Sequence, residues 1–352
     1  MTGRLVRIAV LLLLALSAFT QPAPEPDAPV TAAERAKVIE GSIAALNRYY
    51  VFPDVAKKME QDLRARVARG EYESITSSRA LAEKLQADLR EVSKDKHLGV
   101  GYRSEPVPDR PFNQAPPAEH VERERAFAEK LNFGFEKVER LQGNIGYVDI
   151  RGFLPPAIGG ETAAAAMTFV AGTDALIVDL RRNGGGEPAM IAFVTSYLFD
   201  QPVHLNDIYQ RYDDTTQQWW TTSYAPGRRF GGTKPVYVLT SGHTFSAGEE
   251  FAYNLKNLGR ATIIGETTGG GAHPVDMVKV GEHFFIGVPF ARAISPITKT
   301  NWEGTGVAPD IALPADQAFD RAYVLALEKV IAATADPNRK AGLQRLLDEK
   351  KP

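Results

Sequence analysis

Thr244-Phe-Ser-Ala-Gly-Glu-Glu250 is the stretch of sequence that decides the fold, because it stands between a predicted strand and a predicted helix. Upstream, the apolar and β-branched run Pro235-Val-Tyr-Val-Leu-Thr240 predicts a short buried strand. Downstream, apolar residues recur at helical spacing until Gly259 ends the pattern: Phe251, Leu255 and Leu258. The corner presents Ser246 beside the free amides and the partial positive charge of a helix start, a geometry suited to a nucleophile. In the simpler alternative, Ser246 only caps the helix.

A second corner follows the apolar run Ala175-Leu-Ile-Val-Asp179 and reads Asp179-Leu-Arg-Arg-Asn-Gly-Gly-Gly186. Glycines after a strand let the backbone turn sharply and bring amides close to a bound group, as in an oxyanion hole. A phosphate-binding loop would look similar, but no Gly-Lys-Ser/Thr follows and the dinucleotide-binding spacing is absent. These two strand-to-helix turns, here called the Ser246 corner and the Gly185 corner, predict that one domain supplies both a nucleophilic hydroxyl and the amides of an oxyanion hole.

The sequence resembles the C-terminal processing, or tail-specific, serine proteases. The resemblance covers about residues 30 to 335 and is carried by motifs in the same order and spacing: Asp179–Gly186, Ser246–Glu249, Gly259–Glu266 and Trp302–Asp310. It implies an α/β fold with a crotonase-like superhelical catalytic domain and a small N-terminal helical domain. It also implies a peptidase that forms an acyl-enzyme on Ser246, with the amides of Gly185, Gly186 and Ala247 as the oxyanion hole. Peptides or proteins are the expected substrates, and no metal or other cofactor is expected.

One departure from the best-known members bears on the mechanism. Those enzymes use a Ser-Lys dyad whose lysine lies after Gly265-Glu266, whereas this loop reads Thr267-Thr-Gly-Gly-Gly-Ala-His273, with Gly271 at the place of the lysine. The dyad is therefore excluded. The chain instead resembles the branch of the interphotoreceptor retinoid-binding protein modules and the tricorn core protease. Tricorn uses an upstream histidine and a downstream glutamate, which implies His97 as the base and Glu303 as the acid that orients it.

The chemistry requires such partners because a serine hydroxyl is a poor nucleophile near neutral pH. An imidazole with a pKa near 6.5 can take its proton and return it to the leaving group, while a carboxylate on the other ring nitrogen fixes the tautomer. An unshifted imidazole predicts loss of activity as the pH falls below about 6.5.

Each assignment has alternatives. His97 could be an ordinary residue at a strand end, and Glu303 could be an exposed loop acid. His243, close to the serine, and His273, in the glycine loop, are rival bases. Polar neighbours of the candidates are interpreted as structural, in turns or at the helix end: Asp95, Glu249 and Glu250.

The N-terminus predicts export. The first residues are positively charged, with Arg4 and Arg7, and the apolar run Ile8–Ala18 follows them. This run is too short to span a bilayer stably, and several prolines come after it. This pattern indicates a signal peptide over residues 1–23, with an uncleaved anchor left open. The chain has no cysteine, which excludes a lipoprotein and disulfides. We expect a periplasmic or secreted protein.

Composition and patterning suggest the domain organisation. The capping box Thr31-Ala-Ala-Glu34 starts a helical pattern, and later strands alternate with helices. The expected segments are a helical domain at 30–96, a connecting segment at 97–143, a catalytic domain at 144–335 and a C-terminal helix or tail at 336–352. Many relatives carry a PDZ domain where the connecting segment lies, but about forty residues cannot hold one, so none is expected.

A net charge of −2 gives no electrostatic footprint for nucleic acid or for anionic lipid. The oligomeric state is left open. Two functions compete with a peptidase: binding of a hydrophobic ligand such as a retinoid or fatty acid without turnover, and hydrolysis of small esters. Trp219, Trp220 and Tyr224 could form a specificity surface, but the interpretation as core residues is favoured slightly.

Overall fold

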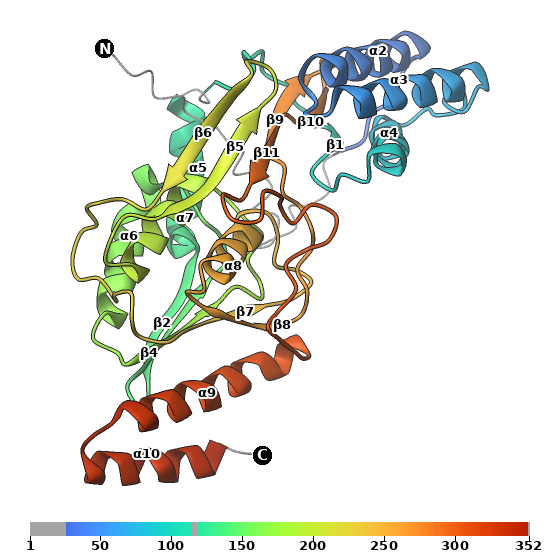
Figure 1. Ribbon diagram of the computed structural model, residues 1–352. Coiled ribbons are helices and arrows are strands. Elements are labelled where there is room, and N and C mark those ends of the chain that lie inside the picture. Colours follow the sequence, from blue (N-terminus) through green and yellow to red (C-terminus); the bar gives the residue numbers. More distant parts are fainter. Residues whose placement is uncertain (1–25, 115–117, 351–352) are drawn as a thin grey trace.

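The computed structural model describes residues 26–114 and 118–350, so the predicted signal peptide lies outside the described residues. Figure 1 shows helices α2–α4 at one end of the molecule, sheets and helices in the middle, and α9 and α10 at the other end. No helix within the described ranges is both long and apolar enough to cross a lipid bilayer.

The predicted N-terminal helices are confirmed as α2 (Ala32–Tyr49), α3 (Pro53–Ala68) and α4 (Ser78–Ser93). The capping box opens α2, because the Glu34 amide donates to Thr31 Oγ1 at 3.2 Å and the Thr31 amide donates to the Glu34 carboxylate at 2.9 Å. Pro53 occupies the first turn of α3, where an amide would have no helical partner.

These helices pack on a sheet in the order β1-β10-β9, formed by β1 (Gly99–Tyr102), β10 (Phe284–Pro289) and β9 (Val275–Lys279). Leu46, Leu85 and Ile286 are buried in their shared core. β1 follows α4 closely and pairs with β10, with Val100 opposite Ile286. The helical region is therefore fixed to the later part of the chain by sheet hydrogen bonds.

The central sheet has the order β12-β8-β7-β4-β3-β2. Its strands are β2 (Phe135–Leu141), β3 (Ile145–Ile150), β4 (Ala175–Asp179), β7 (Val236–Thr240), β8 (Thr262–Gly265) and β12 (Ile311–Ala312). All neighbouring pairs are parallel except β2 with β3. The predicted α/β class is thus confirmed.

Helices cover both faces of this sheet, which explains why its strands are continuous apolar runs. In β4, Leu176 and Val178 face the core shared with α6 (Pro156–Val170), α7 (Pro188–Thr195) and α8 (Ala247–Asn257). Ala175 and Ile177 face the opposite core, which is closed by α9 (Ala318–Ala333) and α10 (Pro337–Lys350). β4 and β7 are adjacent and parallel, so the loops that leave their carboxyl ends emerge side by side.

The remaining elements were not predicted from the sequence. They are α5 (Ala118–Lys130), β5 (His204–Gln210), β6 (Thr215–Trp220), β11 (Ala291–Ile294) and the short 3-10 helices η1 (Asn132–Gly134), η2 (Ser196–Leu198) and η3 (Ala315–Gln317). The interpretation of the aromatic segment as core was wrong for Trp220 and Tyr224, which are 47% and 77% exposed. Trp220 ends the edge strand β6 and stacks on His204 with ring centroids 4.6 Å apart, while Tyr224 lies in the loop that follows.

Candidate active site

Ser246 occupies a strained turn between β7 and α8. Its φ of 52° and ψ of −119° are unusual for a residue with a side chain. Such a conformation costs about 1–3 kcal/mol and persists only where the surroundings impose it, commonly at active sites. In α/β hydrolases, a comparable strained strand-to-helix turn presents the nucleophilic serine, which an adjacent base then activates.

Glu249 holds the serine corner against the glycine loop. Its buried carboxylate accepts hydrogen bonds from the Ser246 amide at 2.8 Å, the Thr268 hydroxyl at 2.6 Å, and the amides of Gly270 and Gly271 at 2.6 and 2.9 Å. Burial raises the pKa of Glu249, and these hydrogen bonds oppose the rise. The structural interpretation of Glu249 fits these contacts.

The two predicted corners touch each other. A Cβ atom placed on Gly185, whose φ is +114°, would lie 2.8 Å from the Ser246 Cβ atom. Asn183 links the corners, because the Phe245 amide donates to its carbonyl at 3.0 Å and the Gly185 amide donates to its Oδ1 at 2.9 Å. Only a residue without a side chain fits at position 185.

The amides differ in their availability for an oxyanion. The Gly185 amide is already engaged by Asn183. In the part of the chain that the structure describes, the amides of Gly186 and Ala247 donate to no other backbone carbonyl, and both residues line the pocket that contains Ser246. The amides of Gly186 and Ala247 are therefore both available to a group bound in this pocket.

His97 lies in the turn between α4 and β1 and is 5% exposed. Its ring packs on Phe245, the residue before the serine, with ring centroids 4.6 Å apart. Its Nδ1 atom is buried and has no hydrogen-bond partner among the described residues, while its amide donates to Asp95 Oδ1 at 2.9 Å. Burial lowers the pKa of the His97 imidazole to about 4, so the ring is neutral at ordinary pH.

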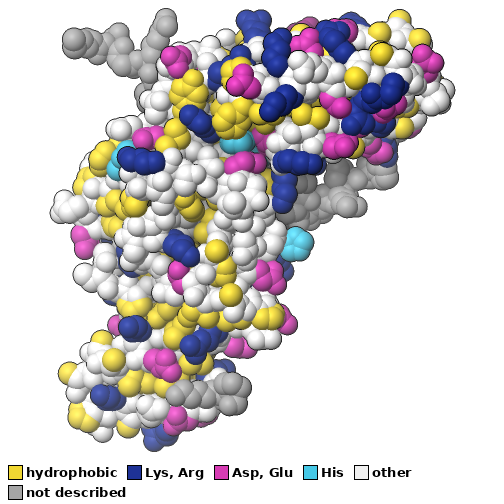
Figure 2. All heavy atoms as spheres, turned by 45° about the vertical axis from the view of Figure 1, so that its right-hand side comes forward, with side chains coloured by type: hydrophobic (Ala, Val, Ile, Leu, Met, Phe, Trp, Pro, Cys, Tyr) yellow, Lys and Arg dark blue, Asp and Glu magenta, His cyan; other side chains and the backbone are white. Residues whose placement is uncertain are grey.

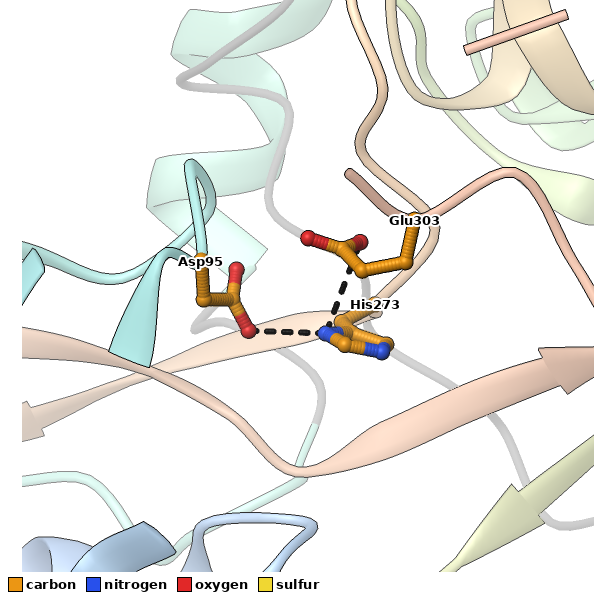
Figure 3. A group of neighbouring side chains, drawn as sticks. All are labelled: Asp95, His273 and Glu303. Atoms are coloured by element: carbon orange, nitrogen blue, oxygen red, sulfur yellow. Dashed lines mark hydrogen bonds and ion pairs between the residues drawn. The ribbon is translucent and has the colours of Figure 1, made fainter. Parts of the chain in front are cut away.

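His273, in the loop before β9, lines the pocket together with Ser246, whereas His97 is not part of the lining. Figure 3 shows two carboxylates directed at His273. Asp95 Oδ2 lies 2.7 Å from Nδ1, and Glu303 Oε2 lies 3.5 Å from the same atom. The Tyr50 hydroxyl also donates to Asp95, at 3.2 Å.

The electrostatics of this cluster follow from burial and proximity. Burial would raise the pKa of Asp95, but the hydrogen bond and charge of His273 lower it overall. Burial would lower the pKa of His273, but Asp95 and Glu303 raise it above its usual value. Burial raises the pKa of Glu303 to about 7. Asp95, His273 and Glu303 each offer an atom that could bind a metal ion, and these atoms lie within 4.8 Å of one another. The shortest contact, between His273 Nδ1 and Asp95, is already explained by a hydrogen bond.

The predicted residues are thus brought together only in part. Ser246, Gly186 and Ala247 share one pocket. His97 packs beside the serine corner, but Glu303 contacts His273 and accepts from the Ala272 amide at 2.5 Å, with no hydrogen bond or ion pair to His97. The pairing of Asp95 with His273 was not predicted from the sequence. The available signal was its place two residues before His97, and only the fold shows which ring it meets.

Comparisons with known proteins identify the family. A family model described as peptidase family S41 matches residues 144–313, and one described as the N-terminal domain of Peptidase_S41 in eukaryotic IRBP matches residues 30–138. The chain belongs to peptidase family S41. Its members are serine peptidases, and the resemblance described from the sequence motifs is confirmed.

Individual relatives are more distant. A tail-specific protease of Haemophilus influenzae is 35% identical over 104 residues, which span 28% of this chain and only 13% of the relative. The structure of a candidate peptidase from Parabacteroides merdae aligns with a TM-score of 0.57 and 19% identity, covering 84% of this chain and 97% of that one. The tricorn protease aligns with a TM-score of 0.53 and 13% identity, covering 91% of this chain and 37% of that one. At these identities the structural matches show the fold alone.

Proposed function

We propose that this chain is an exported serine peptidase that cleaves peptide bonds through an acyl-enzyme on Ser246. The strained backbone of Ser246 at the start of α8, in contact with the Gly185 corner, is the observation that carries the proposal. The hydroxyl oxygen attacks the peptide carbonyl, its proton passes to a histidine, and the amides of Gly186 and Ala247 stabilise the oxyanion. The histidine then protonates the leaving amine, and water releases the acyl group.

Two assignments of the proton-transfer residue follow. The sequence-based assignment takes His97 as the base and Glu303 as the orienting acid; the neutral, unpartnered Nδ1 of His97 beside Phe245 supports the first part. The second takes His273 as the base and Asp95 as its orienting acid. The presence of His273 in the Ser246 pocket and its 2.7 Å contact with Asp95 support this assignment.

The wider proposal includes features that come from the sequence. A signal peptide over residues 1–23 would direct the protein to the periplasm or the outside, where peptides or proteins would be its substrates. The crotonase-like character of the catalytic domain, the absence of a PDZ domain and the domain boundaries at 96, 143 and 335 remain predictions. The mixture of basic and acidic side chains on the face in Figure 2 supports a partner other than nucleic acid.

Fluorophosphonate labelling tests the reaction class directly. The native chain is expected to be labelled at Ser246 and to cleave casein or short peptides. Ser246→Ala is expected to abolish labelling and to lower the rate of peptide cleavage by at least about 1,000-fold, because the variant lacks the nucleophile. Saturable binding of retinoid or fatty acid without labelling would favour the ligand-binding alternative. Turnover of nitrophenyl esters without turnover of any peptide would favour a small-ester hydrolase.

A further inference from the structure

Glu250 is a buried carboxyl that the proposed mechanism leaves unused. It follows Ser246 by one helical turn on α8, and both residues line the same pocket. The residue is only 6% exposed. Within residues 26–114 and 118–350, no Lys, Arg or His forms an ion pair with it, and no cation lowers its pKa. A buried carboxylate normally has such a partner.

Two buried asparagines are the polar neighbours of Glu250. Hydrogen bonding from the side chains of Asn206, on β5, and Asn254, on α8, lowers the pKa of Glu250, although burial is the larger effect and raises this pKa to about 7. Asn206 and Asn254 are 0% and 2% exposed, and among the described residues their contacts with Glu250 fall outside standard hydrogen-bond geometry. Glu250 therefore has neutral neighbours and no cationic partner in the described part of the chain, and a cationic group of a ligand would supply the missing charge.

Apolar side chains make up part of the remaining pocket lining, which also includes His273. Pro188, Ile208 and Trp302 line the pocket together with Ser246 and Glu250. A Lys or Arg side chain combines an aliphatic stem, which suits apolar walls, with a cationic head that forms strong hydrogen bonds to a carboxylate. The amide oxygens of the two buried asparagines can accept the remaining N–H groups of such a head.

Resting on the proposed peptidase function, we propose that Glu250 is the specificity residue of a subsite beside Ser246, and that this subsite receives the Lys or Arg side chain of the residue whose carbonyl is attacked. An uncharged aliphatic side chain would bury Glu250 without a partner. A site built to bind a polar group discriminates strongly against a substrate that lacks it.

The test compares peptides that differ at one residue, which is lysine, arginine, norleucine, glutamine or glutamate, with cleavage sites located by mass spectrometry. For the native chain, kcat/KM is expected to be at least about tenfold higher for lysine or arginine than for norleucine, with cleavage after that residue. In Glu250→Gln, which keeps the shape and removes the charge, the ratio is expected to fall to near one. Glu161→Gln, the same change at an exposed position on α6, is expected to keep the native ratio.

The outcomes separate the subsite from the reaction itself. Fluorophosphonate labelling at Ser246 and peptide cleavage with no preference for lysine or arginine, or with a preference that Glu250→Gln leaves intact, would overturn the subsite alone. Faster cleavage after glutamine than after lysine or arginine would also overturn the subsite, because it would show that a neutral Glu250 binds an uncharged side chain. Neither labelling nor cleavage would overturn the peptidase proposal and the subsite with it.

A second measurement avoids any variant that could misfold. n-Butylguanidinium should slow fluorophosphonate labelling of the native chain by occupying the cationic subsite, whereas n-pentanol at equal concentration should not. Equal effects of the two compounds would contradict the role of charge at Glu250.

Discussion

Asp95 Oδ2 lies 2.7 Å from His273 Nδ1, although 178 positions separate these residues in the chain. Asp95 comes from the turn after α4, and His273 comes from the glycine loop before β9. The same turn is fixed to that loop by Lys96, whose Nζ donates to the Gly269 carbonyl at 2.6 Å. The N-terminal region therefore contributes directly to the surroundings of the serine, in addition to its own core.

Paired substitutions identify the proton-transfer residue. If His97 is the base, His97→Ala should lower kcat by at least about 100-fold while His273→Ala has a smaller effect, because general base catalysis contributes roughly that much. If His273 is the base, the order reverses and Asp95→Asn shares the loss. His243→Ala is the control, since His243 is exposed and outside the pocket lining. Full activity in both histidine variants would contradict histidine-assisted attack.

The pH profile of kcat/KM gives an independent answer. Activity requires the neutral imidazole, so it falls as the pH drops through the pKa of the base. Because burial lowers the pKa of His97 to about 4, protonation of a His97 base should reduce the rate toward an uncharged peptide only as the pH approaches that value. Asp95 and Glu303 raise the pKa of His273, so a His273-dependent rate should already fall at a pH above 6.5. From the sequence, the histidine base was expected to have an unshifted pKa of about 6.5. The structure instead predicts a lower pKa for His97 and a higher pKa for His273.

The Asp95–His273 pair should also make stability depend on pH. The raised pKa of His273 means that its contribution is complete below the unfolded value of 6.5 and is lost as the pH rises through the folded value. The lowered pKa of Asp95 means that its contribution is complete above 3.8 and is lost in more acidic solution. The difference in unfolding free energy between the native chain and Asp95→Asn should therefore be larger at pH 5.5 than at pH 9. Urea titrations check this, and a difference independent of pH would refute the pairing.

Gly185→Ala should damage the serine corner. The added methyl would meet the Ser246 Cβ atom at 2.8 Å and the Phe245 carbonyl at 3.2 Å, in a backbone conformation that disfavours side chains. We expect a loss of about 1–3 kcal/mol in unfolding free energy and at least a tenfold fall in the labelling rate. Gly342→Ala, in helix α10 with no atom within 4 Å of the new methyl, should instead be neutral or stabilising by up to about 1 kcal/mol.

Glu249→Gln should loosen the glycine loop. The glutamine amide group would face backbone amides where the carboxylate now accepts, so at least one buried donor loses its partner. We expect a destabilisation of about 1–3 kcal/mol and a lower kcat, measured by urea unfolding and peptide cleavage. Glu161→Gln provides the exposed control. An unchanged kcat in a destabilised Glu249→Gln variant would show that this carboxylate stabilises the loop without positioning the serine.

The sequence by itself determined the elements whose signals are local. The capping box at Thr31, the apolar runs of β4 and β7, and the corner at Ser246 each follow from neighbouring residues, because caps, buried strands and helix starts depend on short-range geometry. The motifs also sufficed to recognise the family. Local patterns could not reveal which acid meets which histidine, because that depends on how the α4 turn packs against a loop far along the chain.

Tertiary structure alone decided the environment of each candidate group. It placed Asp95 and Glu303 on His273, and it left His97 with an unpartnered Nδ1 beside Phe245. It also turned Glu250, which from the sequence is simply an acid in the first turn of a helix, into a buried carboxyl facing the serine pocket. Burial and through-space contacts set charge state and reactivity, and they arise only when distant segments pack together.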